Sequence, residues 1–271
     1  MIIAIDIGGT KTLVATCKPD GTIVTEQRFE TPDNYKAFLL AVSGAFAKIP
    51  QKDRHITSVA APGKIDRKNG TVLAFGNLPW KNVPLQADIA NISGTEVLLE
   101  NDANLAGLSE AHNIKPLPHR ALYITFSTGI GTGLVTDVYL DPEFLDSEGG
   151  NMLFEHEGKL VIWEKFASGK AIVAKYGKKA SELNDPKAWD EIAKWFALGI
   201  VDLTAVLEPD VIIVGGGVGT HFKKYGAFLT KHINELTPVV VDKPPIVPAK
   251  APEQAVIYGC VILANQHEQH S

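Results

Sequence analysis

Three short apolar segments of this chain each run directly into a glycine-rich loop. The loops read "DIGGTK" at 6–11, "STGIGTG" at 127–133 and "VGGGVG" at 214–219. Apolar runs bounded by glycines predict buried strands. Glycine lets the backbone approach a ligand closely, and successive N–H groups in such a turn form a nest that binds anions. One loop alone is as typical of a plain hairpin turn, but three loops after three strands indicate an α/β protein that binds phosphate groups.

The third loop follows the β-branched strand Val211–Val214 and precedes an expected helix. Nucleotides commonly dock where a strand turns into a helix in this way. The loop is not the dinucleotide fingerprint G-x-G-x-x-G with an acid about 20 residues further on. Taken alone, this loop is weak evidence of a nucleotide site.

The expected elements occur in the same order in both halves of the chain. The first half is predicted to hold strands at Met1–Ile7, Thr12–Cys17, Gly21–Arg28, Ile56–Ala61 and Glu96–Leu99, with helices within Thr31–Ile49 and at Leu85–Asn91 and Ala103–His112. The second half is predicted to hold strands at Ala121–Phe126, Leu134–Thr136, Val211–Val214 and 244–249, with helices at Trp163–Tyr176, Trp189–Leu207, Phe222–Glu235 and Gln254–Asn265. This duplication predicts two α/β lobes with a cleft between them, formed by residues 1–112 plus 254–271 and by residues 113–253. The last residues, "QHEQHS", are expected to be frayed.

Composition excludes several classes of protein. The net charge of -5 forces no basic face, so nucleic acid is not an expected partner, although a local site for an anionic substrate remains open. With only Cys17 and Cys260, we expect neither a disulfide framework nor a cysteine-based zinc site, and both thiols should be reduced core residues. The N-terminus lacks a basic segment and a cleavage signal, and no apolar run reaches the roughly 18 residues of a membrane span. A cytoplasmic protein is therefore expected.

The segment "ENDAN" at 100–104 places two acids and two amides between an apolar strand and an expected helix. Asp102 fits the N-cap of that helix. It also fits a general base that accepts the proton of a substrate hydroxyl. The local sequence allows both interpretations. In the first loop, Asp6 ends its strand and is a candidate to hold Mg²⁺, directly or through water.

These loops, in this order, resemble the ROK family of bacterial sugar kinases, within the actin–hexokinase ATPase superfamily. "DIGGTK" resembles the first phosphate motif, "APGKID" and "GNLPW" the sugar-side loops, "ENDAN" the catalytic-Asp motif and "STGIGTG" the second phosphate motif. "EGGN" with "WEKFASGKAI" resembles the sugar-binding region, and "PDVIIVGGGVG" the adenosine motif. The resemblance extends from Ile2 to about Leu263. It implies a two-lobed actin-like ATPase fold of the ribonuclease H-like type, with mixed sheets flanked by helices and a cleft between the lobes.

The resemblance also implies roles for individual residues. Asp102 would be the general base, and Asn101 would bind the sugar beside it. The other implied sugar-binding residues are Gly63, Asn77, Glu148, Asn151 and Glu164. Asp6 would hold Mg²⁺, directly or through water, and the implied nucleotide-binding residues are Asp6, Gly8, Gly9, Thr10, Lys11, Thr128, Gly129, Gly131, Gly215, Gly216 and Gly217.

The chain departs from the family pattern in one region. Asn151 stands where the family usually has a histidine, and the cysteine-rich zinc loop that normally follows is missing. We therefore expect no zinc site. The choice of sugar stays open, because an amide can form hydrogen bonds with a hydroxyl group but cannot titrate as an imidazole does. His156 is a candidate substitute, but an ordinary hairpin histidine is the favoured interpretation. Shortened, zinc-free members of the family include polyphosphate/ATP glucokinases. Five lysines could contact a polyanion, but a solvated, lysine-rich helix face is the favoured interpretation. They are Lys165, Lys170, Lys175, Lys178 and Lys179.

The expected activity is that of an ATP- and Mg²⁺-dependent hexose kinase, most simply a glucokinase, and the family suggests a homodimer. Polyphosphate as donor, and fructose, mannose, N-acetylmannosamine or N-acetylglucosamine as acceptor, stay open. A sugar-responsive transcription regulator of the same family would carry a helical DNA-binding domain before the first loop, for which the strand beginning at Met1–Ile2 leaves no room. A sugar sensor without catalysis is the remaining alternative.

Overall fold

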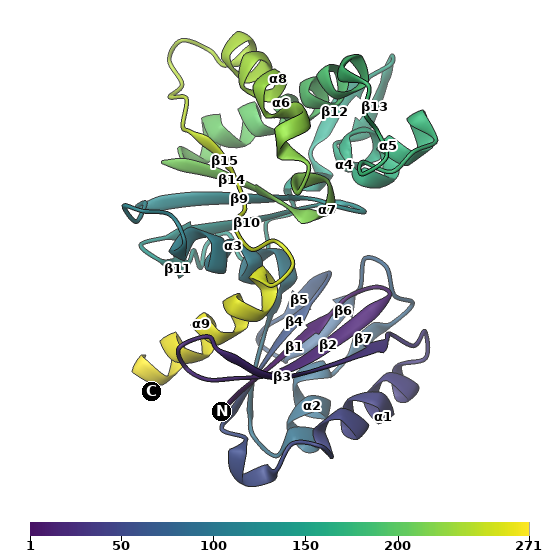
Figure 1. Cartoon of the computed structure of the whole chain (residues 1–271), viewed down its shortest axis with the longest axis vertical. Coiled ribbons are helices and arrows are strands. Elements are labelled where there is room, and N and C mark those ends of the chain that lie inside the picture. Colours follow the sequence, from purple (N-terminus) through teal and green to yellow (C-terminus); the bar gives the residue numbers. More distant parts are fainter. Residues whose placement is uncertain (271) are drawn as a thin grey trace. The chain divides into compact units, whose positions relative to one another are not determined.

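The computed structural model describes residues 1–270 (Figure 1). The chain forms two compact units. Unit 1 comprises Met1–Ser109 and the segment from Gln254 onward, and unit 2 comprises Glu110–Glu253.

Unit 1 is built on a five-stranded sheet with the order β3-β2-β1-β4-β8. β1 (Ile2–Ile7), β4 (Ile56–Ala61) and β8 (Glu96–Asn101) are parallel, whereas β2 (Lys11–Cys17) and β3 (Ile23–Glu30) continue the sheet antiparallel. Parallel strands need crossover connections, and α1 (Tyr35–Phe46) and α2 (Leu85–Ser93) lie within those connections. The carboxyl ends of β1, β4 and β8 therefore meet at one edge.

The two faces of this sheet can be read from the alternation along β1. Ile3, Ile5 and Ile7 pack in a buried cluster with α1 and α2. Ile2 and Ala4 pack on the opposite face with α9 (Ala255–His270) and with Leu105 of α3 (Asp102–His112). Since side chains alternate along a strand, Asp6 points to the α9 face.

Unit 2 repeats the design with the order β11-β10-β9-β14-β15. β9 (Arg120–Phe126), β14 (Val211–Gly215) and β15 (Ile246–Pro248) are parallel, and β10 (Ile130–Thr136) and β11 (Tyr139–Leu140) are antiparallel additions. The predicted duplication of elements is confirmed, because the two sheets follow one strand order.

The core of unit 2 is dominated by α6 (Pro186–Leu207), which packs with α8 (Phe222–Leu236) against the sheet. Asp185 caps α6 through the N–H of Lys187, and Pro186 occupies the first turn, where its missing N–H costs nothing. Trp189, Phe196 and Ile200 are among the residues that form its buried stripe. Burying each such side chain contributes roughly 1.5–3 kcal/mol.

Smaller elements complete both units. In unit 1, β5 (Lys64–Asp66), β6 (Thr71–Ala74) and β7 (Lys81–Val83) form an antiparallel three-stranded sheet, and η1 covers Gln51–Asp53. In unit 2, β12 (Leu153–His156) and β13 (Lys159–Ile162) form a hairpin, with η2 (Gly149–Asn151), α4 (Glu164–Ala167), α5 (Gly169–Tyr176) and α7 (Gly216–Gly219) around it in the chain.

Several sequence-based boundaries were wrong. β3 lies two residues later than Gly21–Arg28, and β10 begins at Ile130 rather than Leu134, because Gly131 and Gly133 take part in the ladder with β9. The strands β5, β6, β7, β11, β12 and β13 were not predicted. The end of the chain is helical through His270 rather than frayed, and Ser271 lies outside the described residues.

Both cysteines are free thiols buried in the core of unit 1, as predicted. Among residues 1–270, no helix combines the length and the apolar character that crossing a membrane requires.

Candidate functional site

The carboxyl edge of the unit 1 sheet collects the acids that the sequence singled out. Asp6 on β1 is paired in register with Ala60 on β4, and Ala61 is paired with Asn101 at the end of β8. Asp102 is the next residue and opens α3. The strand register therefore brings Asp6, Asn101 and Asp102 to one edge.

Asp6 and Asp102 are close enough for their charges to interact. Burial, followed by the negative charge of Asp102, raises the pKa of Asp6 from 3.8 to about 7. Burial also raises the pKa of Asp102, and it outweighs the backbone N–H groups of Ala103 and of Asp102 itself, which lower it. A carboxylate with a raised pKa is a stronger base than an ordinary aspartate, so both groups can accept a proton more readily.

Asn101, and not Asp102, caps α3. The Oδ1 atom of Asn101 accepts hydrogen bonds from the backbone N–H groups of Ala103 at 2.8 Å and of Asn104 at 3.4 Å. These are the second and third helical positions, to which an N-cap side chain bonds. Asp102 is the first residue of the helix. Its Oδ1 accepts from the adjacent Ala103 N–H at 2.9 Å, and its carboxylate also accepts from its own backbone N–H. The sequence-based assignment of Asp102 as the N-cap was wrong by one residue, and the correction leaves Asp102 free of that role.

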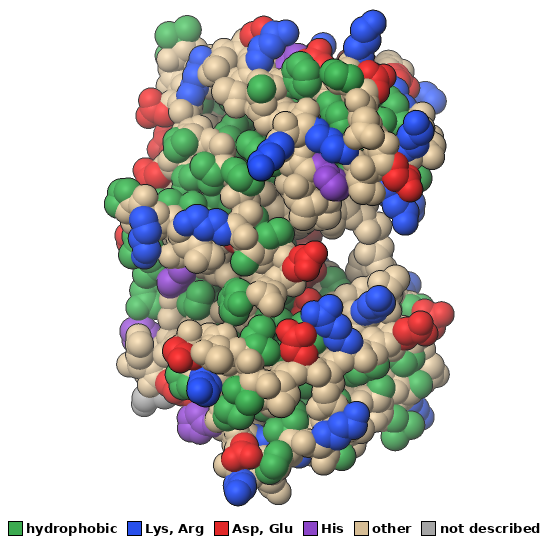
Figure 2. All heavy atoms as spheres, viewed as in Figure 1, with side chains coloured by type: hydrophobic (Ala, Val, Ile, Leu, Met, Phe, Trp, Pro, Cys, Tyr) green, Lys and Arg blue, Asp and Glu red, His purple; other side chains and the backbone are tan. Residues whose placement is uncertain are grey.

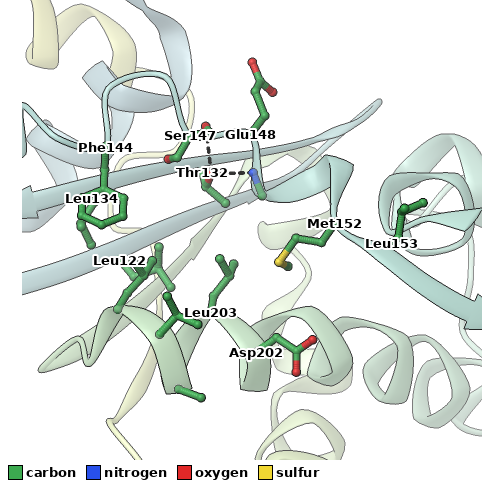
Figure 3. Close-up of a pocket in the computed structure, with 14 residues that line it drawn as sticks. Leu122, Thr132, Leu134, Phe144, Ser147, Glu148, Met152, Leu153, Asp202 and Leu203 are labelled. Atoms are coloured by element: carbon green, nitrogen blue, oxygen red, sulfur yellow. Dashed lines mark hydrogen bonds between the residues drawn. The ribbon is translucent and has the colours of Figure 1, made fainter.

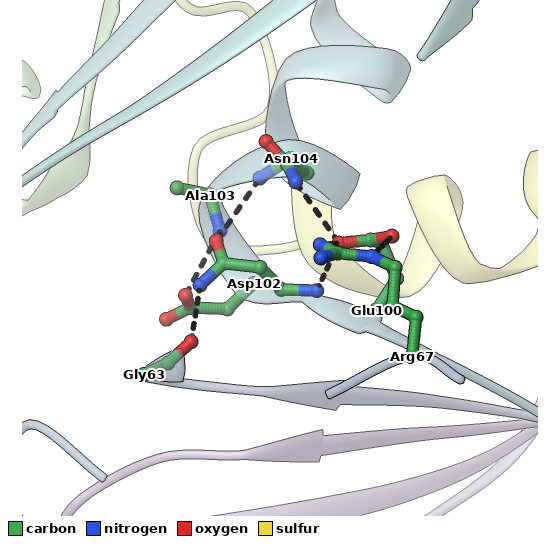
Figure 4. A network of polar contacts seen from close by, with 7 residues as sticks. Gly63, Arg67, Glu100, Asp102, Ala103 and Asn104 are labelled. Carbon is green, nitrogen blue, oxygen red and sulfur yellow. Dashed lines mark hydrogen bonds and ion pairs between the residues drawn. The ribbon is translucent and has the colours of Figure 1, made fainter. Parts of the chain in front are cut away.

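A polar network lies behind the cap (Figure 4). Glu100 is 5% exposed, and its carboxylate is held by the guanidinium of Arg67, which follows β5. The Oε1 atom of Glu100 also accepts from the backbone N–H of Asn101 at 2.6 Å and from the side chain of Asn104 at 2.9 Å. Sequence reasoning missed the partnership with Arg67. The signal available was an arginine beside Asp66 in a sugar-side loop and an acid at the end of an apolar strand.

The remaining predicted residues of unit 1 lie around the same edge. In the first loop, the N–H of Gly8 donates to the carbonyl oxygen of Lys11 at 3.0 Å, which closes a tight turn, and Thr10 and Lys11 are exposed. A Cβ atom on Gly9 would lie 2.8 Å from the Cβ of Asn77, so these two loops touch. Asn101 donates from Nδ2 to the carbonyl oxygen of Gly63 at 3.2 Å. The structure thus links Gly63 to Asn101 and Asn77 to Gly9.

In unit 2, the second and third glycine loops meet around the end of β9. Thr128 and Gly129 form the turn between β9 and β10, in which the N–H of Ser127 donates to the Gly129 carbonyl oxygen at 2.9 Å. Gly131 is inside β10 rather than in the turn, and it pairs with Thr125 of β9. On the other side of β9, Thr125 pairs with Gly215 of β14.

Gly216 begins α7 immediately after β14, and Gly217 is exposed. Gly216 has a φ of 79°, in the left-handed region, and a Cβ there would lie 2.3 Å from the Oγ1 of Thr125. A side chain would therefore be strained at this position and would also collide with β9. Gly215 and Gly216 thus lie against the end of β9, which leads into the Ser127–Gly129 turn.

The sugar-side acids of unit 2 lie next to β10. Glu164, the first residue of α4, would be 2.7 Å from a Cβ atom on Gly129, measured from its Oε2. Glu148 directly precedes η2, and Asn151 is its last residue. A 3.2 Å hydrogen bond from the N–H of Gly149 to the Oγ1 of Thr132 holds η2 to β10. Glu148 and Asn151 are exposed, and Glu164 is half-buried.

A pocket of about 640 Å³ lies behind η2, between β9, β10 and α6 (Figure 3). It is lined mainly by apolar side chains, with Glu148 and Asp202 as its acids, and burial raises the pKa of Asp202. Of the predicted site residues, Glu148 alone lines this pocket.

The other candidates have local explanations. His156 on β12 stacks on Phe166 with ring centroids 4.3 Å apart, in keeping with the hairpin-histidine interpretation. Lys175 forms an ion pair with Glu191 at 2.6 Å and lies over the Trp195 ring. On the face shown in Figure 2, acidic and basic side chains are interspersed. Within residues 1–270, no group of three or more His, Cys, Asp or Glu side chains is arranged to hold a metal ion.

Known proteins resemble this chain in both sequence and fold. The family model described as "ROK family" matches residues 2–267. A glucokinase of Streptomyces coelicolor is 26% identical over 80% of this chain and 82% of its own length. A putative fructokinase of Bacillus subtilis is 28% identical over 98% of this chain and 96% of its own length.

A solved structure has the same fold. The ROK family glucokinase of Streptomyces griseus, crystallised in complex with glucose and AMPPNP, superposes with a TM-score of 0.82 over 98% of this chain and 99% of its own, at 24% sequence identity. The expected actin-like ATPase fold of mixed sheets flanked by helices is thereby confirmed. With a family model matching almost every residue and the motifs in their expected order, the chain belongs to the ROK family.

Proposed function

We propose that this chain is an ATP-dependent sugar kinase that phosphorylates a hydroxyl group of a hexose, with glucose as the first candidate. The observation that carries the proposal is Asp102, a poorly solvated carboxyl group at the start of α3, beside Asp6, with the helix cap left to Asn101. The family, and relatives named glucokinase and putative fructokinase, support a phosphotransferase that acts on an alcohol group of a sugar.

In the proposed mechanism, Asp102 is the general base. Its carboxylate accepts the proton of the sugar hydroxyl while the hydroxyl oxygen bonds to the γ-phosphorus and the bond to the departing ADP breaks. Asn101 orients the sugar through its side-chain amide. Most of the rate acceleration comes from positioning the reactants and from stabilising charge on the phosphoryl oxygens.

The nucleotide-side residues follow from the three glycine loops. The turn of Gly8, Gly9, Thr10 and Lys11 and the turn of Thr128 and Gly129, with Gly131 behind it, serve the phosphates, and Gly215, Gly216 and Gly217 serve the adenosine. These assignments are supported by the glycines in each loop and by the meeting of the second and third loops at β9.

The residues present fit Mg²⁺. The carboxylate of Asp6 is poorly solvated and lies beside a second acid, and carboxylate oxygens are the ligands that Mg²⁺ prefers. When bound, Mg²⁺ supplies charge neutralisation for the phosphates of ATP. Asp6 would hold it directly or through water.

The sugar-side residues are Gly63, Asn77 and Asn101 of unit 1 and Glu148, Asn151 and Glu164 of unit 2. Asn151 can donate and accept hydrogen bonds but cannot titrate, so the sugar is chosen by hydrogen-bond geometry and not by the protonation state of this residue. Glucose is the first candidate because the Streptomyces coelicolor relative is named glucokinase, and the Bacillus subtilis relative, named putative fructokinase, makes fructose the next. Mannose, N-acetylmannosamine and N-acetylglucosamine stay open.

The first test is a coupled assay of ADP formation over a hexose and aminosugar panel, with Asp102→Asn as the diagnostic variant. We expect kcat to fall by about 10²–10⁴-fold, the usual share of general-base catalysis, while ATP affinity measured by calorimetry is unchanged. Asp88→Asn is the matched control, because Asp88 is a half-buried acid on α2 that binds the hydroxyl of Tyr35. Activity of Asp102→Asn equal to that of Asp88→Asn contradicts the base assignment.

The same assay separates the alternatives. Phosphate transfer from polyphosphate in place of ATP would identify a polyphosphate-using kinase, for which the exposed Lys165, Lys170, Lys178 and Lys179 are the candidate contacts. Sugar binding without ADP formation by the unmodified protein would identify a sensor. A homodimer belongs to the proposal because the family suggests it, and light scattering of the purified protein measures its mass directly.

A further inference from the structure

An ion pair at the end of β8 involves two residues, Arg67 and Glu100, that are not among the predicted site residues. Arg67 lies in the hairpin between β5 and β6, and Glu100 lies at the end of β8. Their side chains form an ion pair with two contacts, one of them from Nε of Arg67 to Oε2 of Glu100 at 2.9 Å (Figure 4). A guanidinium that binds a carboxylate through two donors fixes its orientation as well as its position.

Glu100, held in place by Arg67, forms hydrogen bonds with residues before and after Asp102 in the chain. Before Asp102, its Oε1 accepts the backbone N–H of Asn101 at 2.6 Å. After Asp102, the same oxygen accepts the side-chain N–H of Asn104 at 2.9 Å. One carboxylate oxygen therefore fixes the residues on either side of the proposed base.

Asp102 depends on that support because its own side-chain contacts are local. The Oδ1 atom of Asp102 accepts from the adjacent N–H of Ala103 at 2.9 Å, a contact that moves with the backbone. The direction of this carboxylate is consequently set by the backbone from Asn101 to Asn104. A displacement of about 1 Å at a reacting group is enough to cost about 10²-fold in rate.

The hairpin that carries Arg67 is itself held in shape. Asp66 accepts hydrogen bonds from the backbone N–H of Asn69 at 3.3 Å and from its side chain at 2.8 Å, and Asp66 pairs with Thr71 across the hairpin. The strand β5 follows Gly63, whose carbonyl oxygen accepts from Asn101. The residues on either side of β5 therefore contact the end of β8 at two points, Gly63 with Asn101 and Arg67 with Glu100.

Net stabilisation is a poor explanation for the pair. The side chain of Glu100 is 6% exposed and that of Arg67 is 24% exposed. Removing two charges from water costs about as much free energy as their attraction returns, so a buried ion pair is weak evidence of a stabilising role. What the ion pair does supply is a fixed geometry at Asn101 and Asn104, which Glu100 contacts.

We propose that Arg67 is a positioning residue, which orients Glu100 so that the backbone on both sides of Asp102 is held in the arrangement that sugar phosphorylation needs. This inference rests on the proposed function. In this proposal the β5–β6 hairpin has a second role besides contact with the sugar: it fixes the position of Asp102.

The experiment compares Arg67→Lys with Arg54→Lys in the full chain. Lysine keeps the charge of Arg67 but cannot make the two-donor contact. Arg54 is the matched control because it is a half-buried arginine of the same unit, just before β4, and it binds backbone carbonyl groups of Phe46, Ile49 and Ser93. Arg67→Gln is a stronger variant, and Arg67→Lys keeps the test decisive if Arg67→Gln does not fold.

We expect Arg67→Lys to lower kcat by about 10- to 100-fold with the KM for ATP unchanged, because a displaced base weakens only the transition state. Arg54→Lys should keep the kcat of the unmodified protein, even though the loss of hydrogen bonds to backbone carbonyl groups lowers its free energy of unfolding, measured in urea. Wild-type kcat in Arg67→Lys, or an equal loss of kcat in both variants, overturns the proposal.

A second measurement does not depend on sugar phosphorylation. Hydrogen exchange of the backbone amides of residues 101–104 should be faster in Arg67→Lys than in the unmodified protein, and unchanged in Arg54→Lys. If the unmodified protein phosphorylates no sugar, the proposed function fails, and this exchange measurement still decides the positioning role. Equal exchange in the two variants overturns it.

Discussion

At the scale of single residues, the carboxyl groups of Asp6 and Asp102 occupy positions in which a negative charge is poorly solvated. Each of the two has a raised pKa, and the first cause in each case is burial. A protein that keeps two such acids side by side gives up free energy of folding. That cost is expected where acids bind a cation or accept a proton, since functional sites commonly reduce stability.

Asp6→Asn should therefore stabilise the protein above neutral pH. The pKa of Asp6 is raised from 3.8 to about 7, so the folded state binds the proton more tightly than the unfolded state. This contribution to stability is full below about pH 4 and is lost as the pH rises through 7. Asparagine is neutral at every pH, so the variant should gain at least about 1 kcal/mol at pH 8, since one pKa unit corresponds to about 1.4 kcal/mol.

The measurement is urea denaturation at pH 4 and pH 8. The gain should vanish at the lower pH. Asp20→Asn is the control of opposite sign, because the pKa of Asp20 is lowered by hydrogen bonds from Thr22. A gain in Asp20→Asn as large as that in Asp6→Asn at pH 8, or an equal gain for Asp6→Asn at both pH values, contradicts the argument.

At the scale of elements, the glycine loop after β14 is a junction in which two adjacent glycines have different constraints. Gly216 has a φ of 79°, and a Cβ there would approach the Oγ1 of Thr125 to 2.3 Å and the carbonyl oxygen of Phe126 to 2.6 Å. Gly217 is exposed and has no atom within 4 Å of the place of a Cβ. The fold requires glycine at the first position and not at the second.

Gly216→Ala is accordingly expected to lower the free energy of unfolding by about 1–3 kcal/mol, the cost of a residue held in a strained backbone conformation. It should also weaken ATP binding, because relief of the clash moves α7 away from β9. Gly217→Ala should keep the stability of the unmodified protein. Urea denaturation and calorimetry with ATP measure the two effects, and equal stability of the two variants would contradict this account.

The elements also show what a single sequence can reveal. The strands β1, β4, β9 and β14 are mainly apolar, with few polar residues, and each was predicted within two residues of its bounds. The short strands β5 and β7 hold three residues each in segments rich in Gly, Pro and Asn, so local pattern favours a loop, and only pairing with β6 makes them strands. At the candidate site, motif order singled out Asp6 and Asp102. The partnership of Arg67 with Glu100 joins residues 33 positions apart, so each residue stands out in its own segment but neither segment identifies the other as its partner.

At the scale of the whole molecule, the chain builds one strand order twice. Each unit has its own five-stranded sheet and its own buried clusters, and the chain passes between the units twice, near Ser109 and near Gln254. The duplication was visible in the sequence as a repeated order of elements, although the two halves share no evident sequence repeat. Separate cores imply that a defect in one unit leaves the core of the other complete.

The tryptophans allow this to be tested, because Trp80 is in unit 1 whereas Trp163, Trp189 and Trp195 are in unit 2. In a Trp80→Phe background, fluorescence reports on unit 2 alone, while circular dichroism reports on both units. Phe46 of unit 1 and Phe196 of unit 2 are both fully buried, and replacing either with alanine should cost about 3–5 kcal/mol in its own unit.

We expect Phe46→Ala to leave the urea midpoint of the fluorescence transition unchanged while circular dichroism shows an earlier transition. Phe196→Ala is the matched control and should shift the fluorescence midpoint to lower urea. The physical reason is that Phe46 packs only in the cluster formed by α1, α2 and the unit 1 sheet, and Phe196 only in the cluster around α6. If Phe46→Ala moves the fluorescence midpoint as far as Phe196→Ala does, the two units unfold as one cooperative body, and the stability of each depends on the other.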